Sequence, residues 1–341
     1  MAGLLLQHKI KQNNVHWLEY HWYRRTPLHL VLLPLSCLFL VLVSMRRALY
    51  RYGVLASTKL PVPVIVIGNI SVGGTGKTPL TLALAQQLVE CGWHPLIISR
   101  GYGGSVQQQA VITTQHTSQQ VGDEPLLMAR RNICPVWVGA DRVATAHAAL
   151  LAYPQCDIIL YDDGLQHYRL QRDAEIVVID GVRQFGNGWL FPAGPLREPQ
   201  SRLKTVDIQV VNGTTATAAQ YAMQLDGTVF YNLRHPEQTA TPAEFQHSRN
   251  HAVAGIGHPQ RYFDYLQQLG IRHTPHAFPD HHPYQADDLA FADCDAILLT
   301  EKDAVKCGAF ADARYWVLRV DALVAPTLLA NILRKIAPHG R

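Results

Sequence analysis

The hydrophobic positions divide the chain into an apolar amino-terminal segment and a longer region built from short, alternating elements. Residues 30–43 are apolar apart from Pro34 and Ser36. From residue 62 onward, short apolar runs typical of buried strands alternate with stretches that have helical periodicity. Such alternation is typical of a mostly parallel sheet with helices on both faces. The pattern therefore predicts an α/β fold with two α/β domains.

The individual elements follow from these apolar runs and from the turn residues between them. The predicted strands span residues 62–70, 96–99, 136–138, 157–161, 175–179, 207–211, 252–256, 296–299 and 316–320. The predicted helices span residues 80–91, 142–152, 260–269 and 326–336, and a short helix runs from Pro125 to Arg131. Residues 212–220 lack large apolar side chains, which indicates a linker. We therefore predict an amino-terminal helical segment over residues 1–52, a first domain over 53–220 and a smaller carboxy-terminal α/β domain over 221–341.

The amino-terminal segment has the composition of a membrane-associated helix. Arginines at positions 24, 25, 46, 47 and 51 flank the apolar run, and residues typical of the water–bilayer interface precede it: Trp17, Tyr20, Trp22 and Tyr23. A spanning helix needs about 20 apolar residues, so this run is short, and no A-x-A cleavage site follows it. We predict a helix that lies in or dips into one leaflet. A buried core helix and a true span are the alternatives.

The overall composition excludes several classes of protein. With 48% hydrophobic and 16% charged residues, the chain can bury a core and is not a disordered protein. A formal net charge of +4 without a long basic block does not favour nucleic acid as a partner. The six cysteines show no CxxC spacing, so neither a zinc site nor a disulfide framework is indicated. We interpret them as small apolar residues of a protein in a reducing cytoplasm.

The strongest chemical signal is a glycine-rich turn between a predicted strand and a predicted helix. Residues 64–79 read VIVIGNISVGGTGKTP. Glycines let successive N–H groups point inward, and the helix start adds partial positive charge, which together make a cradle for phosphate. The residues predicted to hold the nucleotide are Ser71, Val72, Gly73, Gly74, Thr75, Gly76, Lys77 and Thr78. Lys77 would reach the β- and γ-phosphates and the Thr78 hydroxyl would bind Mg²⁺. The strict pattern has glycine at position 71, where this chain has Ser71, and a chance glycine turn is the alternative.

A pair of carboxylates ends a second predicted strand. Asp162 and Asp163 follow the apolar run at 157–161, and His167 lies on the same predicted turn. In phosphate-loop enzymes a carboxylate at this point holds or orients Mg²⁺, because both strands end at one edge of the sheet. A simple strand-terminating turn is the alternative.

Three further segments carry polar side chains that would suit a kinase. Asp123 and Glu124 precede Pro125, where helix capping explains them at least as well as catalysis does. The turn at 280–282 places a carboxylate beside two imidazoles, and an Asp or an Asp–His pair can accept a hydroxyl proton. The loop at 187–199 carries Arg197, which could face a phosphate, and Glu198, which could join the metal shell. A polar turn and a surface loop are the alternatives for the last two segments.

With these residues in view, the chain resembles the tetraacyldisaccharide 4′-kinase family, the lipid A kinases of Gram-negative bacteria. The resemblance covers nearly the whole chain. It depends on GNISVGGTGKTP at 68–79, SRGYGG at 99–104, VGDEPLL at 121–127, DDGLQH at 162–167, GNGWLFPAGPLREP at 186–199, FPDHHPY at 278–284 and LTEKDAVK at 299–306. Within this family, Ser71 is an ordinary variant of the phosphate loop.

The resemblance implies an activity and a role for each candidate residue. ATP would donate its γ-phosphate to the 4′-hydroxyl of a tetraacylated glucosamine disaccharide 1-phosphate, giving lipid IV-A. The catalytic residues would be Asp123 as base, His281 as its partner, and Lys77; Thr78, Asp162 and Glu198 would bind Mg²⁺; Arg100, Tyr102, Asp163, His167 and Arg197 would line the site. The two domains would be joined by a two-stranded hinge, with catalysis in the cleft between them. His281 is favoured over His282 because it directly follows Asp280.

These expectations locate the protein at the cytoplasmic face of the inner membrane, with a lipid-linked substrate and no nucleic acid or obligate protein partner. Two other functions share some of the same motifs. A membrane-bound ATPase or GTPase switch would need no base in a second domain, and no NKxD motif supports a GTPase. A kinase for a soluble metabolite would leave residues 1–50 without a role.

Overall fold

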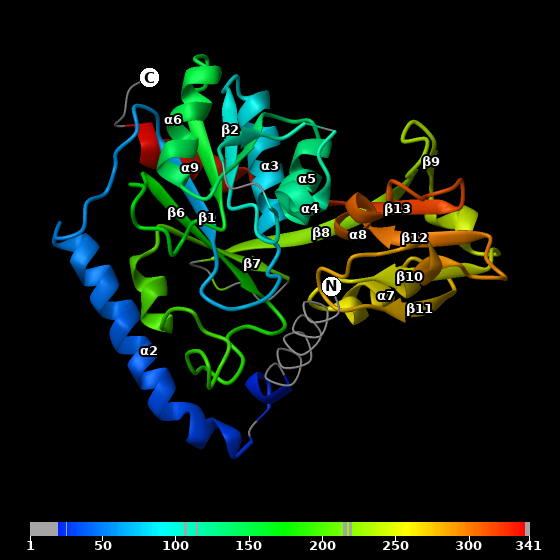
Figure 1. Ribbon diagram of the computed structural model, residues 1–341, viewed down its shortest axis with the longest axis horizontal. Coiled ribbons are helices and arrows are strands. Elements are labelled where there is room, and N and C mark those ends of the chain that lie inside the picture. Colours follow the sequence, from blue (N-terminus) through cyan, green and yellow to red (C-terminus); the bar gives the residue numbers. More distant parts are fainter. Residues whose placement is uncertain are drawn as a thin grey trace. The chain divides into compact units, whose positions relative to one another are not determined.

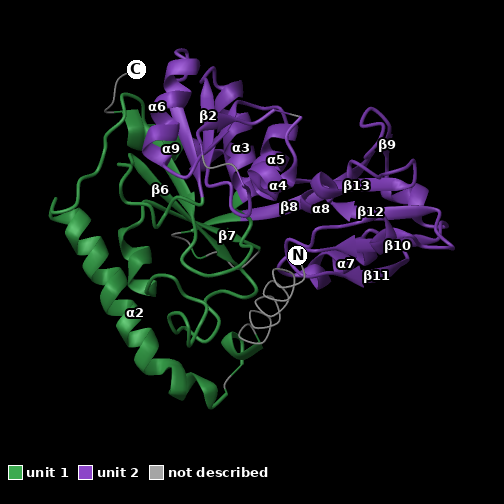
Figure 2. Cartoon of the chain, in the orientation of Figure 1, with its two compact units in different colours: residues 1–77, 163–222, 330–341 green, residues 78–162, 223–329 purple. Residues whose placement is uncertain are grey.

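The structure is a computed structural model that describes residues 20–24, 26–105, 108–113, 115–213, 217 and 220–337. The predictions for Trp17, Arg25, residues 1–19 of the amino-terminal segment, and residues 214–216 and 218–219 of the linker fall outside these residues. The chain forms two compact units (Figure 2). Unit 1 holds residues 1–77, 163–222 and 330–341, and unit 2 holds residues 78–162 and 223–329. Each unit draws on both predicted α/β domains, and the domain borders at 52 and 220 stay predictions.

Unit 1 contains three parallel strands that position the phosphate loop. They are β1 (Val64–Gly68), β6 (Ala174–Asp180) and β7 (Ile208–Asn212). In the sheet they lie in the order β7–β6–β1 (Figure 1). Every residue of β1 and β6 is buried. Strands that are buried on both faces carry continuous apolar runs, which explains why sequence patterns located them. Because the strands are parallel, the residues that follow β1 and β6 leave the sheet at the same edge.

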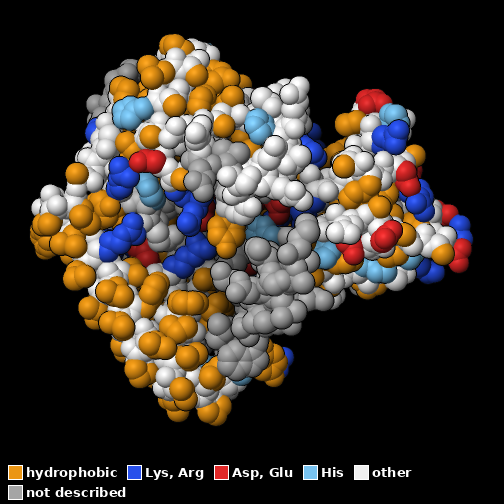
Figure 3. All heavy atoms as spheres, in the orientation of Figure 1, with side chains coloured by type: hydrophobic (Ala, Val, Ile, Leu, Met, Phe, Trp, Pro, Cys, Tyr) orange, Lys and Arg blue, Asp and Glu red, His pale blue; other side chains and the backbone are white. Residues whose placement is uncertain are grey.

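The amino-terminal helix of unit 1 is longer than the apolar run that predicts it. Helix α2 spans Leu28–Arg51 and continues through Pro34. By length and composition it could cross a membrane, and only 6% of its most apolar window is buried in the protein. Its exposed side chains include a stripe at helical spacing, namely Val31, Leu35, Leu38, Leu42 and Met45. Figure 3 shows apolar side chains gathered over α2. The alternative of a buried core helix is therefore wrong.

A small set of polar and aromatic contacts fixes α2 to the loop at 187–199. The Ser36 hydroxyl donates to the Leu190 carbonyl (2.9 Å) and accepts a hydrogen bond from the Ala193 N–H (3.0 Å). The rings of Phe39 and Phe191 meet edge to face with their centroids 5.9 Å apart. Further along the helix, Arg46 donates to the Gln166 carbonyl (3.1 Å). One side of α2 is therefore attached to the protein, and the apolar stripe faces away.

Unit 2 contains a second group of parallel strands and the helices around them. The strands are β2 (Pro95–Ser99), β4 (Val136–Val138) and β5 (Ile158–Asp162), with the short antiparallel β3 (Ala110–Val111), in the order β5–β2–β4–β3. The helices are α3 (Lys77–Glu90), which begins at the last residue of unit 1, α4 (Ser118–Val121), α5 (Asp123–Arg130) and α6 (Arg142–Ala152). Asp141 caps α6 by accepting from two backbone N–H groups.

The carboxy-terminal part of unit 2 is a mixed sheet in the order β11–β10–β12–β13–β8, with β9 paired to β8. Its strands are β8 (Tyr221–Asn232), β9 (Thr239–Ala240), β10 (Asn250–Ala254), β11 (His273–Ala277), β12 (Ala296–Thr300) and β13 (Tyr315–Val324). Its helices are α7 (Pro259–Gln268), α8 (Glu301–Cys307) and the first residues of α9 (Pro326–Ile336). The two longest strands, β8 and β13, pair antiparallel from Trp316 opposite Asn232 to Val324 opposite Met223.

The predicted mixed α/β fold with a largely parallel sheet is confirmed, and the patterns missed elements for identifiable reasons. Strand β8 is exposed along much of its length and has a mixed polar sequence, so it has no continuous apolar run. Strand β11 is an edge strand that contains Pro275, a residue that central strands avoid. Helix α8 has only seven residues and begins directly after β12, at the Thr300 cap.

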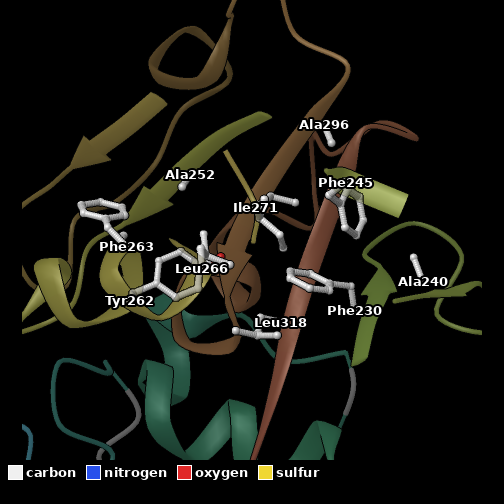
Figure 4. Close-up of a cluster of buried hydrophobic side chains, with 12 residues drawn as sticks. Phe230, Ala240, Phe245, Ala252, Tyr262, Phe263, Leu266, Ile271, Ala296 and Leu318 are labelled. Carbon is white, nitrogen blue, oxygen red and sulfur yellow. The ribbon is translucent and has the colours of Figure 1, made fainter. Parts of the chain in front are cut away.

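A cluster of aromatic and aliphatic side chains forms one core of this sheet (Figure 4). Phe230 on β8 is fully buried, and its ring lies 4.8 Å from that of Phe245. Leu318 on β13, opposite Phe230, and Leu266 on α7 belong to the same cluster. Because the pair of rings spans the strand and the segment that follows it, this core joins β8 to the rest of the sheet.

We expect Phe230→Ala to lower the free energy of unfolding by about 3–5 kcal/mol, because it removes buried apolar surface and leaves a cavity. Its neighbour Val229 points to the opposite face and is 43% exposed, so Val229→Ala should change the stability by less than about 0.5 kcal/mol. Urea unfolding of both variants checks this. Equal losses for the two variants would contradict the assignment of Phe230 to the core.

Candidate active site

The glycine-rich loop leaves β1 after Gly68 and ends where α3 begins at Lys77. Gly73 and Gly76 have φ values of 107° and 97°, in the left-handed region that glycine enters without a Cβ clash. The Asn69 amide donates to the Gly73 carbonyl (3.3 Å), and the Asn212 amide donates to the Thr75 carbonyl (3.0 Å). These side chains fix the loop's carbonyls on both sides of Gly74.

A strand-like segment at 195–197 supports the other side of the loop. The Val72 N–H donates to the Pro195 carbonyl (2.7 Å), and the Arg197 N–H donates to the Ile70 carbonyl (2.7 Å). Ser71 forms an antiparallel bridge with Leu196. Since a bridged residue has an extended backbone, position 71 does not need glycine. The structure therefore explains how Ser71 fits where the strict pattern has glycine.

Three of the predicted residues meet in unit 1 beside this loop. Asp163 Oδ1 lies 3.4 Å from Lys77 Nζ and 3.6 Å from an Arg197 guanidinium nitrogen. Burial raises the pKa of Asp163, but the charges of Lys77 and Arg197 lower it further, so the pKa lies below its ordinary value. Asp163 is therefore a carboxylate at neutral pH. It also has a φ of 52°, which is uncommon for a residue other than glycine.

Asp162 and Glu198, which are predicted metal ligands, are both buried. Asp162 is the last residue of β5 in unit 2 and accepts a hydrogen bond from the Thr81 hydroxyl (3.1 Å). Glu198 in unit 1 accepts hydrogen bonds from the Gln166 amide and the Tyr168 hydroxyl, both at 2.8 Å. The structure thus places Glu198 among these donors.

The remaining predicted residues of this group are Thr78, on a helix of unit 2, and His167, on a turn of unit 1. Thr78 is the second residue of α3 and is partly buried. His167 belongs to the turn after Asp163: its N–H donates to the Gly164 carbonyl (2.9 Å), and its own carbonyl accepts a hydrogen bond from Arg172 (2.6 Å). These contacts hold the turn, and they leave the predicted role of His167 a prediction.

Unit 2 brings together the predicted base and its partner. Asp123 is the first residue of α5, and its Oδ2 lies 2.8 Å from His281 Nδ1. The side chain of Asp123 is 9% exposed, and that of His281 is 36% exposed. The residue before the helix, Gly122, makes no side-chain cap. His282 instead pairs with Asp288 (3.1 Å), so of the two neighbouring imidazoles it is His281 that contacts Asp123.

The SRGYGG segment forms the surroundings of Asp123. A Cβ on Gly122 would come within 2.7 Å of the Tyr102 carbonyl oxygen, and the φ of Gly122 is 91°, so glycine is required on both counts. The Tyr102 ring lies 5.9 Å from the ring of His281, and the Arg100 guanidinium lies 5.9 Å from the Tyr102 ring. Close backbone packing of this segment thus sets where α5 begins.

Several charged residues near these groups were missed from the sequence. Arg183 follows β6 and lines a small hollow with Ser71–Thr75 of the loop. Lys302 and Lys306 on α8 approach the Asp123–His281 pair. The sequence feature that could have identified Arg183 is its position just after the buried strand β6, which is parallel to β1. The signal for the two lysines was the LTEKDAVK motif, to which no role had been assigned.

The oxygen donors of the site fit a hard divalent cation. Mg²⁺ binds one or two carboxylates together with phosphate oxygens and waters; Asp163 in unit 1, and Thr78 and Asp162 in unit 2, carry oxygens of this kind. Asp163 Oδ1 is buried, and its two cationic neighbours are farther away than a charge-assisted hydrogen bond requires. Within the described residues, no cluster of three His, Cys, Asp or Glu side chains could hold a metal. A site completed by phosphate oxygens and water is consistent with both observations.

The chain is similar over most of its length to the proteins of one family. The sequence model of a family described as tetraacyldisaccharide-1-P 4′-kinase matches residues 28–337. Relatives named tetraacyldisaccharide 4′-kinase include one from Methylobacillus flagellatus, 49% identical over 320 residues (94% of this chain and 96% of the relative). Another, from Azoarcus sp. strain BH72, is 47% identical over 327 residues (94% of this chain and 95% of the relative). The crystal structure of apo-form LpxK from Aquifex aeolicus in complex with ATP is similar, with a TM-score of 0.77 and 28% identity, covering 91% of this chain and 99% of that one.

We expect the stability difference between the wild type and Asp163→Asn to depend on pH. A carboxyl group whose folded-state pKa is lowered stabilises the folded protein above its unfolded pKa, and this contribution is lost as the pH falls through the folded value. The free energy of unfolding of the wild type, relative to Asp163→Asn, should therefore decrease below about pH 4. Denaturant unfolding at a series of pH values measures it.

Lys77→Met is the control for this prediction, since Lys77 is the main cause of the lowered pKa. In that background, the same comparison should show a weaker pH dependence. A stability difference that stays constant from about pH 6 to about pH 3 would contradict the assignment.

Proposed function

The chain belongs to the tetraacyldisaccharide-1-P 4′-kinase family, and we propose that it transfers the γ-phosphate of ATP to the 4′-hydroxyl of a tetraacylated glucosamine disaccharide 1-phosphate, giving lipid IV-A. The observation that carries this proposal is the 2.8 Å contact between Asp123 and His281. A hydroxyl acceptor has a proton to lose, and a carboxylate oriented by an imidazole suits that task. A nucleotide-dependent switch would need no such pair.

In the proposed reaction, Asp123 accepts the proton of the sugar hydroxyl as the oxygen attacks the γ-phosphorus. The new O–P bond forms while the bond from that phosphorus to the β–γ bridging oxygen breaks, and ADP leaves. Lys77 and the loop N–H groups stabilise the negative charge on the phosphates. His281 orients Asp123 through its Nδ1. The negative charge of Asp163 offsets part of the positive charge of Lys77 and Arg197.

We assign Thr78, Asp162 and Glu198 as the groups that would hold Mg²⁺, and the loop from Ser71 to Thr78 as the part that binds ATP. When bound, Mg²⁺ supplies Lewis-acid stabilisation of the phosphate oxygens. Arg100, Tyr102 and His167 line the site in this proposal. Support for the metal comes from the oxygen donors themselves, and support for ATP comes from the loop and from the ATP complex of the Aquifex aeolicus protein.

The same proposal assigns α2 to the cytoplasmic face of the inner membrane. The exposed apolar stripe from Val31 to Met45 would enter the lipid, where the acyl chains of the substrate stay buried. Arg46 and Arg51 near the end of the helix suit contact with anionic head groups. A kinase for a soluble metabolite would have no use for this surface.

We also propose that residues 53–220 and 221–341 act as the two domains of the enzyme. Two apolar clusters of unit 2 draw only on residues between Phe230 and Leu318, which supports a separate core for the carboxy-terminal domain.

Asp123→Asn should lower the rate of phosphate transfer from labelled ATP to the disaccharide 1-phosphate lipid in detergent micelles by about 10²–10⁴-fold. The amide keeps the shape of the side chain but cannot accept the proton, so ATP binding should be retained. The matched control is Asp293→Asn, whose side chain is 89% exposed and should leave the rate unchanged. ATP hydrolysis without labelled lipid in the wild type would favour a switch, and full activity of Asp123→Asn would return Asp123 to a helix-start role.

Replacing Leu35, Leu38 and Leu42 together by Glu should move the protein from the membrane fraction to the soluble fraction. Each charge placed in the lipid costs about 2.5–3.5 kcal/mol at full depth, which is more than the lost apolar contact alone. Fractionation of cell lysates measures this. The control replaces three exposed aliphatic residues outside α2, namely Val89, Leu151 and Val229, by Glu, and this variant should remain with the membrane. Release of both variants would remove the assignment of α2 as the anchor.

A further inference from the structure

Helix α8 carries two lysines that approach the predicted base and its partner, and the proposed reaction gives them no role. Both lie in the LTEKDAVK motif at 299–306. Lys302 Nζ lies 3.0 Å from Asp280 Oδ1, 3.4 Å from Glu124 Oε1 and 3.4 Å from His281 Nε2. Its side chain is 17% exposed. A single buried ammonium therefore contacts the turn that carries His281 and the helix that carries Asp123.

Helix α8 is itself fixed firmly against α5. Arg131, just after the end of α5, forms an ion pair with Glu301 (2.8 Å) and donates to the Val320 carbonyl (2.7 Å). Asp303 is fully buried and accepts hydrogen bonds from the Gly255 N–H (3.0 Å) and from Lys306 Nζ (2.9 Å). Because α8 is held at several points, the position of Lys302 is set by the fold and not by a flexible surface contact.

We propose that Lys302 is a positioning residue that keeps His281 neutral, with its proton on Nδ1, so that the imidazole donates to Asp123 and leaves the carboxylate free to accept the proton of the substrate. This inference rests on the proposed function for its catalytic consequence. The state of His281 itself can be tested without any substrate.

The tautomer follows from the donors and acceptors present. An ammonium group has three donors and no acceptor, so the His281 Nε2 that faces Lys302 is the acceptor nitrogen. In a neutral imidazole the other nitrogen then carries the hydrogen. Nδ1–H therefore donates to Asp123 Oδ2. The Lys306 contact, at 3.9 Å, is also to Oδ2, so His281 and Lys306 approach the same oxygen of Asp123.

The charge balance around His281 gives Lys302 its effect. The Asp123 carboxylate, 2.8 Å from Nδ1, and the Asp280 carboxylate, 3.8 Å from Nε2, favour positive charge on this ring. Lys302 and Lys306 oppose it, and the Tyr102 ring covers one side. Burial lowers the pKa of Lys302, but Glu124 and Asp280 raise it further, above its ordinary value, so Lys302 stays charged at neutral pH. Without Lys302, the two carboxylates would face the His281 ring with one cation fewer.

Lys302 also holds the backbone that presents His281. The φ of His281 is 62°, a left-handed value that is uncommon for this residue type. Asp280 Oδ1 accepts both the His281 N–H (3.0 Å) and the Lys302 ammonium. The same oxygen therefore fixes the turn and its cation, so that the ring of His281 is aimed at Asp123 and Lys302 together.

The first test is the pH dependence of kcat/KM for lipid phosphorylation by the full-length enzyme in micelles. For Lys302→Met we expect the acid limb to move to higher pH by about one unit, because the positive charge that opposes protonation of the Asp123–His281 pair has been removed. This corresponds to a loss of about tenfold on the acid side of neutrality and a smaller loss above it. Lys302→Arg keeps the charge and should stay close to the wild type. Lys335→Met, which removes a half-exposed lysine paired with Asp207, is the matched control and should leave the profile unchanged.

A loss for Lys302→Met that is the same at every pH would mean that the lysine has only a structural role, and would overturn the inference. An inactive wild type would instead refute the proposed function.

The second test observes His281 directly in ¹⁵N-histidine-labelled protein without ATP or lipid, with His281→Gln used to assign its signals. The side-chain ¹⁵N shifts should show the Nδ1-protonated tautomer in the wild type, and a protonated or Nε2-protonated ring in Lys302→Met. An Nε2-protonated or doubly protonated ring in the wild type at neutral pH would overturn the inference, whatever the enzyme proves to phosphorylate.

Discussion

The antiparallel contact between the phosphate loop and the segment at 195–197 is the constraint on which unit 1 depends. Two backbone hydrogen bonds, from Val72 to Pro195 and from Arg197 to Ile70, join segments that lie more than a hundred residues apart. They hold Ser71 extended and place the Arg197 side chain beside Asp163. The loop at 187–199, which contains this segment, is attached to α2 through Ser36. A buried backbone needs partners for its polar groups, so neither side of this contact can move without breaking bonds that the other side supplies.

Charge pairing explains how partly buried carboxylates in each unit stay ionised. A buried carboxylate is costly unless a cation or several donors face it. Asp163 faces Lys77 and Arg197, and Asp280 faces Lys302, and in both cases the neighbours hold the pKa of the carboxyl below its ordinary value. Each of these carboxylates can therefore remain negatively charged at neutral pH. A proton acceptor and a cation site both need that state, whereas a set of unpaired buried acids would bind protons.

The sequence predicted the parts of the fold that have a continuous pattern and a fixed spacing. The strands before the phosphate loop and before Asp162 are buried on both faces, and their apolar runs are unbroken. The contact between Asp123 and His281 joins residues 158 positions apart, and only the family resemblance suggested it. Lys302 was missed because it lies on a helix too short for a periodic pattern, and because its acidic partners come from two other segments. Long-range pairing of this kind is a property of the fold, and a local pattern cannot show it.

Glu198 makes contacts that stabilise the fold whether or not it binds a metal. Its carboxylate is 1% exposed, with Gln166 and Tyr168 donating to separate oxygens and Arg202 Nε 3.3 Å away. Burial and the negative charge of Glu198 raise the pKa of Tyr168 to about 12, so the phenol keeps its proton and remains a donor. A carboxylate has about four acceptor positions, so these donors do not use them all. Removing the carboxylate would leave Arg202, also buried, beside fewer acceptors and would loosen the segment that carries Arg197. Loss of activity in a Glu198 variant would therefore not distinguish a lost metal ligand from a displaced arginine.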